Sequence, residues 1–170
     1  MRIVACSTAI AVLVVGTLFS PARAEDKMVH NTLATSKFAN FPGLPTCTMG
    51  AVQSGDPSSG ASVILVKATS GCVVPWHWHT PTEQLMIVSG RAKAEMKDGS
   101  PVAVHAGDYL SMPSKSPHQF TCVSACTFFV ASDAAFDIHY VDASGNEIPA
   151  EQALKKSSKM PAKKPAPKSE

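Results

Sequence analysis

The chain has 170 residues and a formal net charge of +2, which allows one domain with tails at both ends. The charge is unevenly divided: residues 25–150 hold seven Lys/Arg and eleven Asp/Glu, a net of −4, whereas residues 151–170 hold six Lys and two Glu, a net of +4. A mildly acidic body lacks the basic surface that nucleic-acid binding needs, so nucleic acid is excluded as the partner.

The N-terminal segment has the pattern of a secretory signal peptide. Arg2 precedes an apolar run over residues 3–19, and a small-x-small sequence follows at residues 22–24. This pattern predicts a signal peptide over residues 1–24 and a mature chain that begins at Glu25. An uncleaved membrane anchor is the alternative, but the apolar run is short and contains Ser and Thr. No other stretch could span a membrane, so we expect an exported protein, periplasmic or secreted.

The body of the chain, residues 40–149, follows an N-terminal arm over residues 25–39 and reads as short strands separated by Gly, Pro, Asp and Ser. No helical pattern of ten or more residues occurs there, although the sequence allows a short helix before Phe38 or near Glu151. Short strands at regular spacing predict an all-β sandwich or barrel. Besides the histidine-containing stretch discussed below, the strand-like runs are MGAV, SVILVKA, QLMIVSG, RAKAEMK, SPVAVHAGDYLSM, HQFTC, CTFFVAS and FDIHYVD.

The C-terminal segment, residues 150–170, is predicted to be a disordered tail. From Glu151 onward it has six Lys, three Pro and almost no bulky apolar residue. Such a composition buries too little surface to offset the entropy of ordering the chain. A basic tail could contact an anionic membrane surface or a polyanion, but a solvated tail is the simpler interpretation.

Four cysteines remain after the predicted cleavage, namely Cys47, Cys72, Cys122 and Cys126. An even number in an exported protein suggests disulfides. Cys122 and Cys126 flank three residues between two strand-like runs, and Cys47 and Cys72 lie near the outer ends of another expected hairpin. We therefore predict the pairs 47–72 and 122–126, with four free thiols or a metal-binding cluster as the alternatives.

The segment HWH presents two imidazoles to one side of an expected strand. Successive side chains of a strand alternate between its faces, so His77 and His79 project together while Trp76 and Trp78 project to the other side. Neutral imidazoles two residues apart on a strand can converge on one ion. The two tryptophans are then core or dimer-interface aromatics.

Two further residues are candidates to complete a metal site. Glu83 follows the Pro-containing bend TPT, which can bring the next strand back beside the first. His118 likewise follows a proline at the start of a strand-like run. Gln84 is an alternative ligand if the bend differs. The remaining histidines, His30, His105 and His139, are expected at the surface or in packing.

The stretch from Gly71 to Gly90 resembles the first sequence motif of the cupin superfamily, which is Gly, five residues, His-x-His, three or four residues, Glu, six residues, Gly. The second cupin motif is matched by Gly107, Pro113 and His118. It departs from the family in two places, because Lys115 stands where the motif has Gly and Cys122 where it has Asn. The chain is similar to small exported single-domain bacterial cupins of the type-2 kind.

This resemblance implies a single cupin jelly-roll β-barrel over residues 40–149, with one divalent metal ion inside. The implied ligands are His77, His79, Glu83 and His118. Three imidazoles and a carboxylate suit Fe, Mn, Ni, Zn or Cu. Residues with the same inward direction are expected to line a pocket beside the ion, and these are Leu85, Ile87, Met112 and Phe120.

A metal with open coordination positions can bind and activate a small molecule. The expected function is therefore a metal-dependent enzyme that acts on a small, oxygen-rich organic molecule, with a dioxygenase as the leading type and a decarboxylase, isomerase or lyase as alternatives. No second catalytic group is evident from the sequence. A non-catalytic metal or small-ligand binding module, such as a sensor, is the competing reading. The resemblance also implies a homodimer formed through sheet edges.

Overall fold

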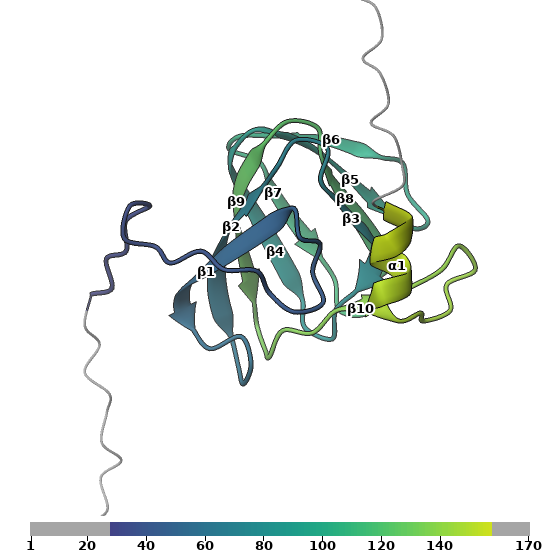
Figure 1. The fold of residues 1–170 in the computed structure, drawn as a ribbon, viewed down its shortest axis with the longest axis horizontal. Coiled ribbons are helices and arrows are strands. Elements are labelled where there is room, and N and C mark those ends of the chain that lie inside the picture. The colour runs from purple at the N-terminus through teal and green to yellow at the C-terminus, as the bar shows by residue number, and fades with distance from the viewer. Residues whose placement is uncertain (1–27, 158–170) are drawn as a thin grey trace, which may run out of the picture.

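The structure is a computed structural model that describes residues 28–157. The predicted signal peptide and residues 158–170 of the predicted tail lie outside the described residues. Within the described part, strands predominate and one short helix follows them (Figure 1). The elements are β1 Thr48–Gly55, β2 Ser62–Ala68, β3 Val73–Trp78, β4 Glu83–Ser89, β5 Arg91–Met96, β6 Val102–His105, β7 Tyr109–Met112, β8 His118–Cys122, β9 Cys126–Ser132, β10 His139–Tyr140 and α1 Ala150–Ser157.

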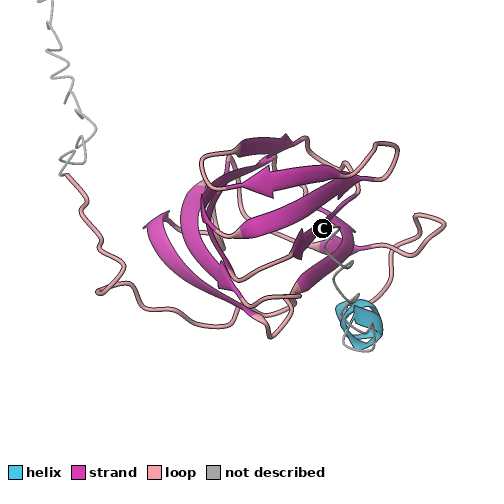
Figure 2. Ribbon diagram, turned by 90° about the horizontal axis from the view of Figure 1, so that it is seen from above, coloured by secondary structure: helices cyan, strands magenta, loops and turns pink. Residues whose placement is uncertain are grey.

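The strands form two antiparallel sheets. One has the order β1-β2-β9-β4-β7 and the other the order β10-β3-β8-β5-β6. Most neighbours in each sheet are far apart in the chain, and the two sheets curve around a common interior (Figure 2). The prediction of an all-β barrel is therefore confirmed.

The interior is filled by alternate residues of the central strands. Along β8 and β9 every second side chain is buried, and the same alternation holds over the first five residues of β4. This period of two follows from the pleat of an extended chain, which sends successive side chains to opposite faces. The inward residues of both sheets join in one hydrophobic core, and the inward direction of β8 carries His118 and Phe120 into it.

Two of the expected strand runs are shorter or divided. Residues 136–142 were expected as one strand, but only β10 pairs there, and it is two residues long. The preceding backbone is drawn out of the sheet because Phe136 N–H donates to the carbonyl of Pro57 at 2.8 Å. The expected run over residues 100–112 is divided into β6 and β7 by a turn at Gly107, whose φ is +92°.

The segment expected to be disordered from residue 150 begins instead with α1. This helix lies outside the barrel (Figure 2) and contacts β3 and β10. Ala153 is 4% exposed, so the helix buries one small apolar side chain against the sheet and is ordered by that contact. A short helix near Glu151 was allowed by the sequence, but a lysine-rich composition does not show that one alanine is buried. Within residues 28–157 no helix is long and apolar enough to cross a membrane.

One of the two expected disulfides is present. Cys47 is bonded to Cys72, whereas Cys122 and Cys126 are buried free thiols. The predicted 122–126 bridge is corrected by the topology: Cys122 ends β8 in one sheet and Cys126 begins β9 in the other, so their connection crosses between sheets and closes no hairpin. The Cys126 thiol donates to the carbonyls of Arg91 and Ser124, at 3.3 and 3.2 Å. Burial raises the pKa of the Cys122 thiol, and its contact with Cys126 adds to this.

Lys115 occupies the turn position where the cupin motif has glycine, and its φ is +56°. The left-handed region is costly for a residue with a Cβ and nearly free for glycine. We expect Lys115→Gly to raise the free energy of unfolding by about 0.5–1 kcal/mol, measured by urea denaturation. Lys97→Gly, at an exposed turn position without positive φ, should lower it instead. An equal loss of unfolding free energy in both variants would contradict the view that the positive φ of Lys115 costs stability.

Candidate metal centre

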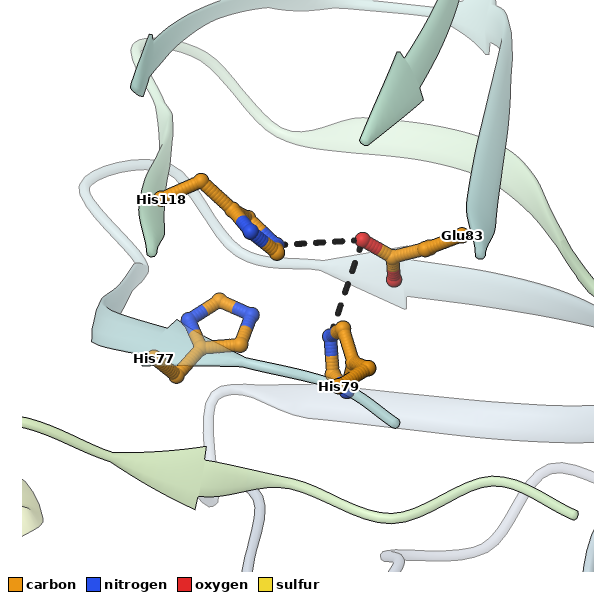
Figure 3. A group of neighbouring side chains, drawn as sticks. All are labelled: His77, His79, Glu83 and His118. Carbon is orange, nitrogen blue, oxygen red and sulfur yellow. Dashed lines mark ion pairs between the residues drawn. The ribbon is translucent and has the colours of Figure 1, made fainter. Parts of the chain in front are cut away.

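Four side chains from three strands and one bend meet at the same end of the barrel. His77 lies in β3 and His79 just after it, Glu83 begins β4, and His118 begins β8. His77 and His118 are directly paired across β3 and β8, which places their rings side by side with centroids 4.2 Å apart. All four residues are buried, none more than 7% exposed. One potential ligand atom from each lies within 4.8 Å of the others (Figure 3).

The backbone sets which ring nitrogen of each histidine is available. Nδ1 of His77 faces the carbonyl of Pro75 at 2.6 Å, and Nδ1 of His118 faces the carbonyl of Ser116 at 2.9 Å. Nδ1 of His79 hydrogen-bonds the carbonyl of Asp137. A carbonyl oxygen can only accept, so each Nδ1 must carry the proton and each neutral ring keeps the lone pair on Nε2.

The Nε2 atoms lack partners that would explain their burial. Nε2 of His79 and Nε2 of His118 are buried without a hydrogen bond. Oε2 of Glu83 lies 3.6 Å from Nε2 of His79 and 3.3 Å from Nε2 of His118, but with the proton on Nδ1 neither Nε2 can donate a hydrogen bond to it. Buried polar atoms without partners are rare in proteins and indicate an ion, a water or a functional role.

Burial and neighbouring charge favour the protonation states that a metal site needs. Burial lowers the pKa of His77 well below its usual range, and repulsion from His118 and His79 lowers it further. Burial also lowers the pKa of His79, although Glu83 partly offsets it. For Glu83 burial opposes ionisation, but the contacts with His118 and His79 outweigh it and lower the pKa. Burial therefore favours neutral rings at His77 and His79, and the neighbouring imidazoles favour an ionised carboxylate at Glu83.

The donor set fits a divalent transition-metal ion. Three neutral imidazole nitrogens and one carboxylate oxygen suit Fe, Mn, Ni, Zn or Cu, which prefer such mixed nitrogen and oxygen ligands. A carbonyl on the second nitrogen of each ring is the usual way in which proteins orient metal-binding histidines. The fit rests on the orphaned Nε2 atoms and on the chemistry of the donors.

The bend between β3 and β4 is held by two carboxylates of the segment that follows β9. Asp137 Oδ1 accepts from Thr80 N–H at 2.7 Å, and Asp133 Oδ1 accepts from Thr82 N–H at 3.0 Å. Asp137 therefore contacts the bend twice, through its side chain and through the carbonyl that holds His79. The sequence analysis missed this residue, because a separation of 57 residues leaves no local pattern to reveal it.

We expect Asp137→Ala to weaken metal binding by about tenfold, because the carbonyl that orients His79 loses its side-chain anchor. The matched control is Asp133→Ala, which removes the comparable bond to Thr82 and touches no histidine of the cluster. Competition with a chelating dye measures both affinities. An equal loss of metal affinity in the two variants would mean that the conformation of the bend, and not the orientation of His79, determines the affinity.

A cavity with a volume of about 60 Å³ adjoins the cluster. Its walls come from both sheets and from two loops, with Phe41 and Leu44 on one loop and Phe136 and Ile138 on the other. The rings of Phe136 and His79 lie 4.6 Å apart. The sequence analysis missed these loop residues, since apolar residues in loops give no periodic signal. The walls also offer few polar partners to the oxygen-rich molecule that was expected.

Two of the four residues expected to line the pocket do so, namely Leu85 and Phe120. Ile87 belongs to the hydrophobic core and does not line the cavity, because it lies four residues along β4 from Glu83, about 13 Å at the rise of a strand. Met112 is paired with Glu83 but lies in the edge strand β7, on the far side of β4 from the cavity, and faces a separate hollow beside β5 and β8.

The remaining candidates lie away from the cluster. Gln84 follows Glu83 in β4 and so faces the other side of the strand, where its side-chain oxygen accepts a hydrogen bond from the Tyr109 hydroxyl at 3.0 Å. His139 stacks on Trp78, with centroids 3.9 Å apart and an interplanar angle of 4°. His105 and His30 are exposed.

Comparison with known proteins agrees with this arrangement. The family model for the cupin domain matches residues 64–132, which contain the whole four-residue cluster. The polyketide cyclase RemF from Streptomyces resistomycificus has the same fold, with a TM-score of 0.62 at 17% identity over 80% of this chain and 96% of that one. Residues 64–132 of the chain form a cupin domain.

Two other solved structures have a similar fold. An RmlC-like cupin from Shewanella frigidimarina matches with a TM-score of 0.54 at 13% identity, over 64% of this chain and 92% of that one. The DMSP lyase DddQ from Ruegeria pomeroyi matches with a TM-score of 0.51 at 19% identity, over 59% of this chain and 57% of that one. A comparison with curated protein sequences finds no match. At these identities the likeness shows the fold.

Proposed function

We propose that this cupin is a divalent-metal-dependent enzyme that acts on a small organic molecule, with dioxygenation as the leading reaction. The observation that supports this is the convergence of His77, His79, Glu83 and His118 beside a cavity. Four protein donors leave two positions of an octahedral ion open for oxygen or substrate. A bound ion would supply Lewis-acid or oxygen chemistry at those positions.

The chain's own residues would hold the ion, orient the substrate and exclude water. The carbonyls of Pro75, Ser116 and Asp137 keep the protons on Nδ1, so that no ring has to change tautomer when the ion binds. The apolar walls keep water from the reacting group. Dioxygenation places both atoms of O2 in the product, so the reaction balances without an outside reductant. The lining offers no titratable side chain beyond the four ligands, which favours a reaction that needs no separate general acid or base.

A non-catalytic metal or small-ligand binding module is the second candidate. The same lining favours it, because many metal-assisted reactions also use a general acid or base near the substrate. The experiment that separates the two begins with identification of the metal in protein taken from its native compartment. Oxygen consumption is then measured with Fe, Mn, Ni and Cu forms against a panel of enol and catechol-like compounds. Turnover supports the enzyme, whereas tightly bound zinc without an exchangeable water and without turnover supports the binding module.

We also propose that the protein is exported, in the periplasm or beyond it. The Cys47–Cys72 disulfide is compatible with an oxidising compartment. N-terminal sequencing of protein from the periplasmic and culture fractions should begin at Glu25, and a chain that retains Met1 would contradict the predicted cleavage. The homodimer stays a prediction, and light scattering of the purified protein would check it.

A further inference from the structure

We propose that the substrate of this cupin is compact and largely apolar, with one oxygen-containing group that reaches the metal and no second charged or hydroxylated end. The inference deepens the proposed function and rests on it. It concerns the walls of the cavity and not the cluster itself. It replaces the oxygen-rich substrate class that was expected from a metal site with open coordination positions.

The lining offers almost nothing for a polar ligand to bond. Of the eighteen residues that line the cavity, four are the clustered ligands, one is Thr48, one is Gly50 and the other twelve are apolar. Thr48 is 4% exposed, and its hydroxyl already donates to the carbonyl of Pro45 at 2.7 Å. Apart from the clustered ligands, this lining contains no Lys, Arg, Asp, Asn, Gln or Tyr.

The loops that carry the outer apolar residues are held in place by contacts between them, so the apolar walls are a fixed part of the structure. The buried Tyr140 donates its hydroxyl to the carbonyl of Gly43 at 2.8 Å, which ties the loop of Phe41 to the segment that follows Phe136. A Cβ added to Gly43 would lie only 3.6 Å from Ile138, so the two loops lie close together. A polar substrate cannot easily gain partners by displacing either loop.

Desolvation then selects against polar substrates. A hydroxyl moved from water into such walls without a new hydrogen bond costs about tenfold in affinity, and an unpaired charge costs more. The volume limits size as well: 60 Å³ is well below the roughly 150 Å³ cavity that takes up benzene. A short alkyl or alkenyl tail fits this space, whereas a sugar acid or a dicarboxylate leaves its second polar end unpaired.

A series of hydroxamates tests the inference, because they share one metal-binding head and differ only in the tail. The full chain is loaded with Co(II), and binding is followed by its visible absorption and by calorimetry. The probes are acetohydroxamate, butanohydroxamate, butanohydroxamate with two tail hydroxyls, and the analogue whose tail ends in a carboxylate. We expect butanohydroxamate to bind at least tenfold more tightly than the hydroxylated and carboxylated probes. Equal or tighter binding of either polar probe would overturn the inference.

A substitution in the cavity wall tests whether the preference for an apolar tail arises in this cavity. Val66 lines the cavity and is 9% exposed, so Val66→Thr places a hydroxyl in the wall and should reduce the preference for the apolar tail by about fivefold. Val104→Thr is the control, since Val104 is 1% exposed in the core and outside the lining. If Val66→Thr does not fold, Val74→Thr, at a half-buried lining position, takes its place. An unchanged preference in the folded wall variant would overturn the assignment to this cavity.

The outcomes separate this inference from the proposed function. A chain that takes up no cobalt, or whose cobalt does not respond to acetohydroxamate, overturns the proposed metal-dependent function and the inference with it. A chain whose cobalt binds acetohydroxamate but does not distinguish the tails overturns the inference alone.

Discussion

Replacing His118 with alanine should weaken the binding of zinc or cobalt by more than a hundredfold. The loss should exceed the 10- to 100-fold effect typical of removing a residue that only orients a ligand, because a donor itself is removed. His118 is 3% exposed and its unpartnered Nε2 lies 3.3 Å from the Glu83 carboxylate. Without the ring, the carboxylate also loses its nearest neighbour in the cluster. Competition with a chelating dye gives the affinity, and elemental analysis gives the stoichiometry.

His105→Ala is the matched control for this prediction. His105 is an exposed residue at the end of β6 and lies beside Asp108. Its replacement removes an imidazole of the same chemistry and should leave metal affinity unchanged. Circular dichroism would verify that both variants keep their strands. If His118→Ala retained one tightly bound ion per chain, the four-residue cluster would not be the metal site.

Removing the disulfide with Cys47→Ala and Cys72→Ala together should lower the free energy of unfolding by about 3.5 kcal/mol. The bridge joins residues separated by 25 positions, and closing a loop of that length in the unfolded chain gives roughly this figure in the chain-entropy model. The folded domain should then melt about 10 °C lower. The loss should also loosen the loop of Phe41 and Leu44, because Cys47 follows that loop directly.

A reductant provides the control for the disulfide prediction. Dithiothreitol should reproduce the loss of stability in the natural chain and add nothing in the double variant. A second double variant, Cys122→Ala with Cys126→Ala, should remain sensitive to the reductant because its Cys47–Cys72 bridge is intact. If the reductant had no effect on the natural chain, the bridge would not contribute to folding stability.

The cysteines show where sequence reasoning succeeded and where it failed. Both expected pairs were argued from strand ends, but the argument for Cys122 and Cys126 assumed that neighbouring strands share a sheet. In a barrel of two sheets the chain repeatedly crosses from one sheet to the other, and β8 and β9 do so at these residues. A count of the intervening residues cannot distinguish a hairpin from such a crossing.

The residues expected to line the pocket also include some that sequence reasoning placed correctly and some that it did not. Leu85 and Phe120 were found because each lies two residues from a cluster residue and so faces the same way. Ile87 and Met112 also face inward. Ile87, however, lies too far along β4 from Glu83, and Met112 lies in β7, on the other side of β4 from the cavity. The direction of a side chain is a local property, whereas its distance from the cluster depends on how strands are arranged.

The sequence by itself determined most of the strands and the inward direction of His77 and His79, because the alternation of an extended backbone is a local property. Its resemblance to the cupins implied Glu83 and His118 as the partners of the two histidines. Only the tertiary structure decided that Asp137 holds His79, that two loops supply the outer side chains of the cavity, and that its walls are apolar. Those features join segments up to 97 residues apart, and contacts at such separations depend on the packing of the whole barrel.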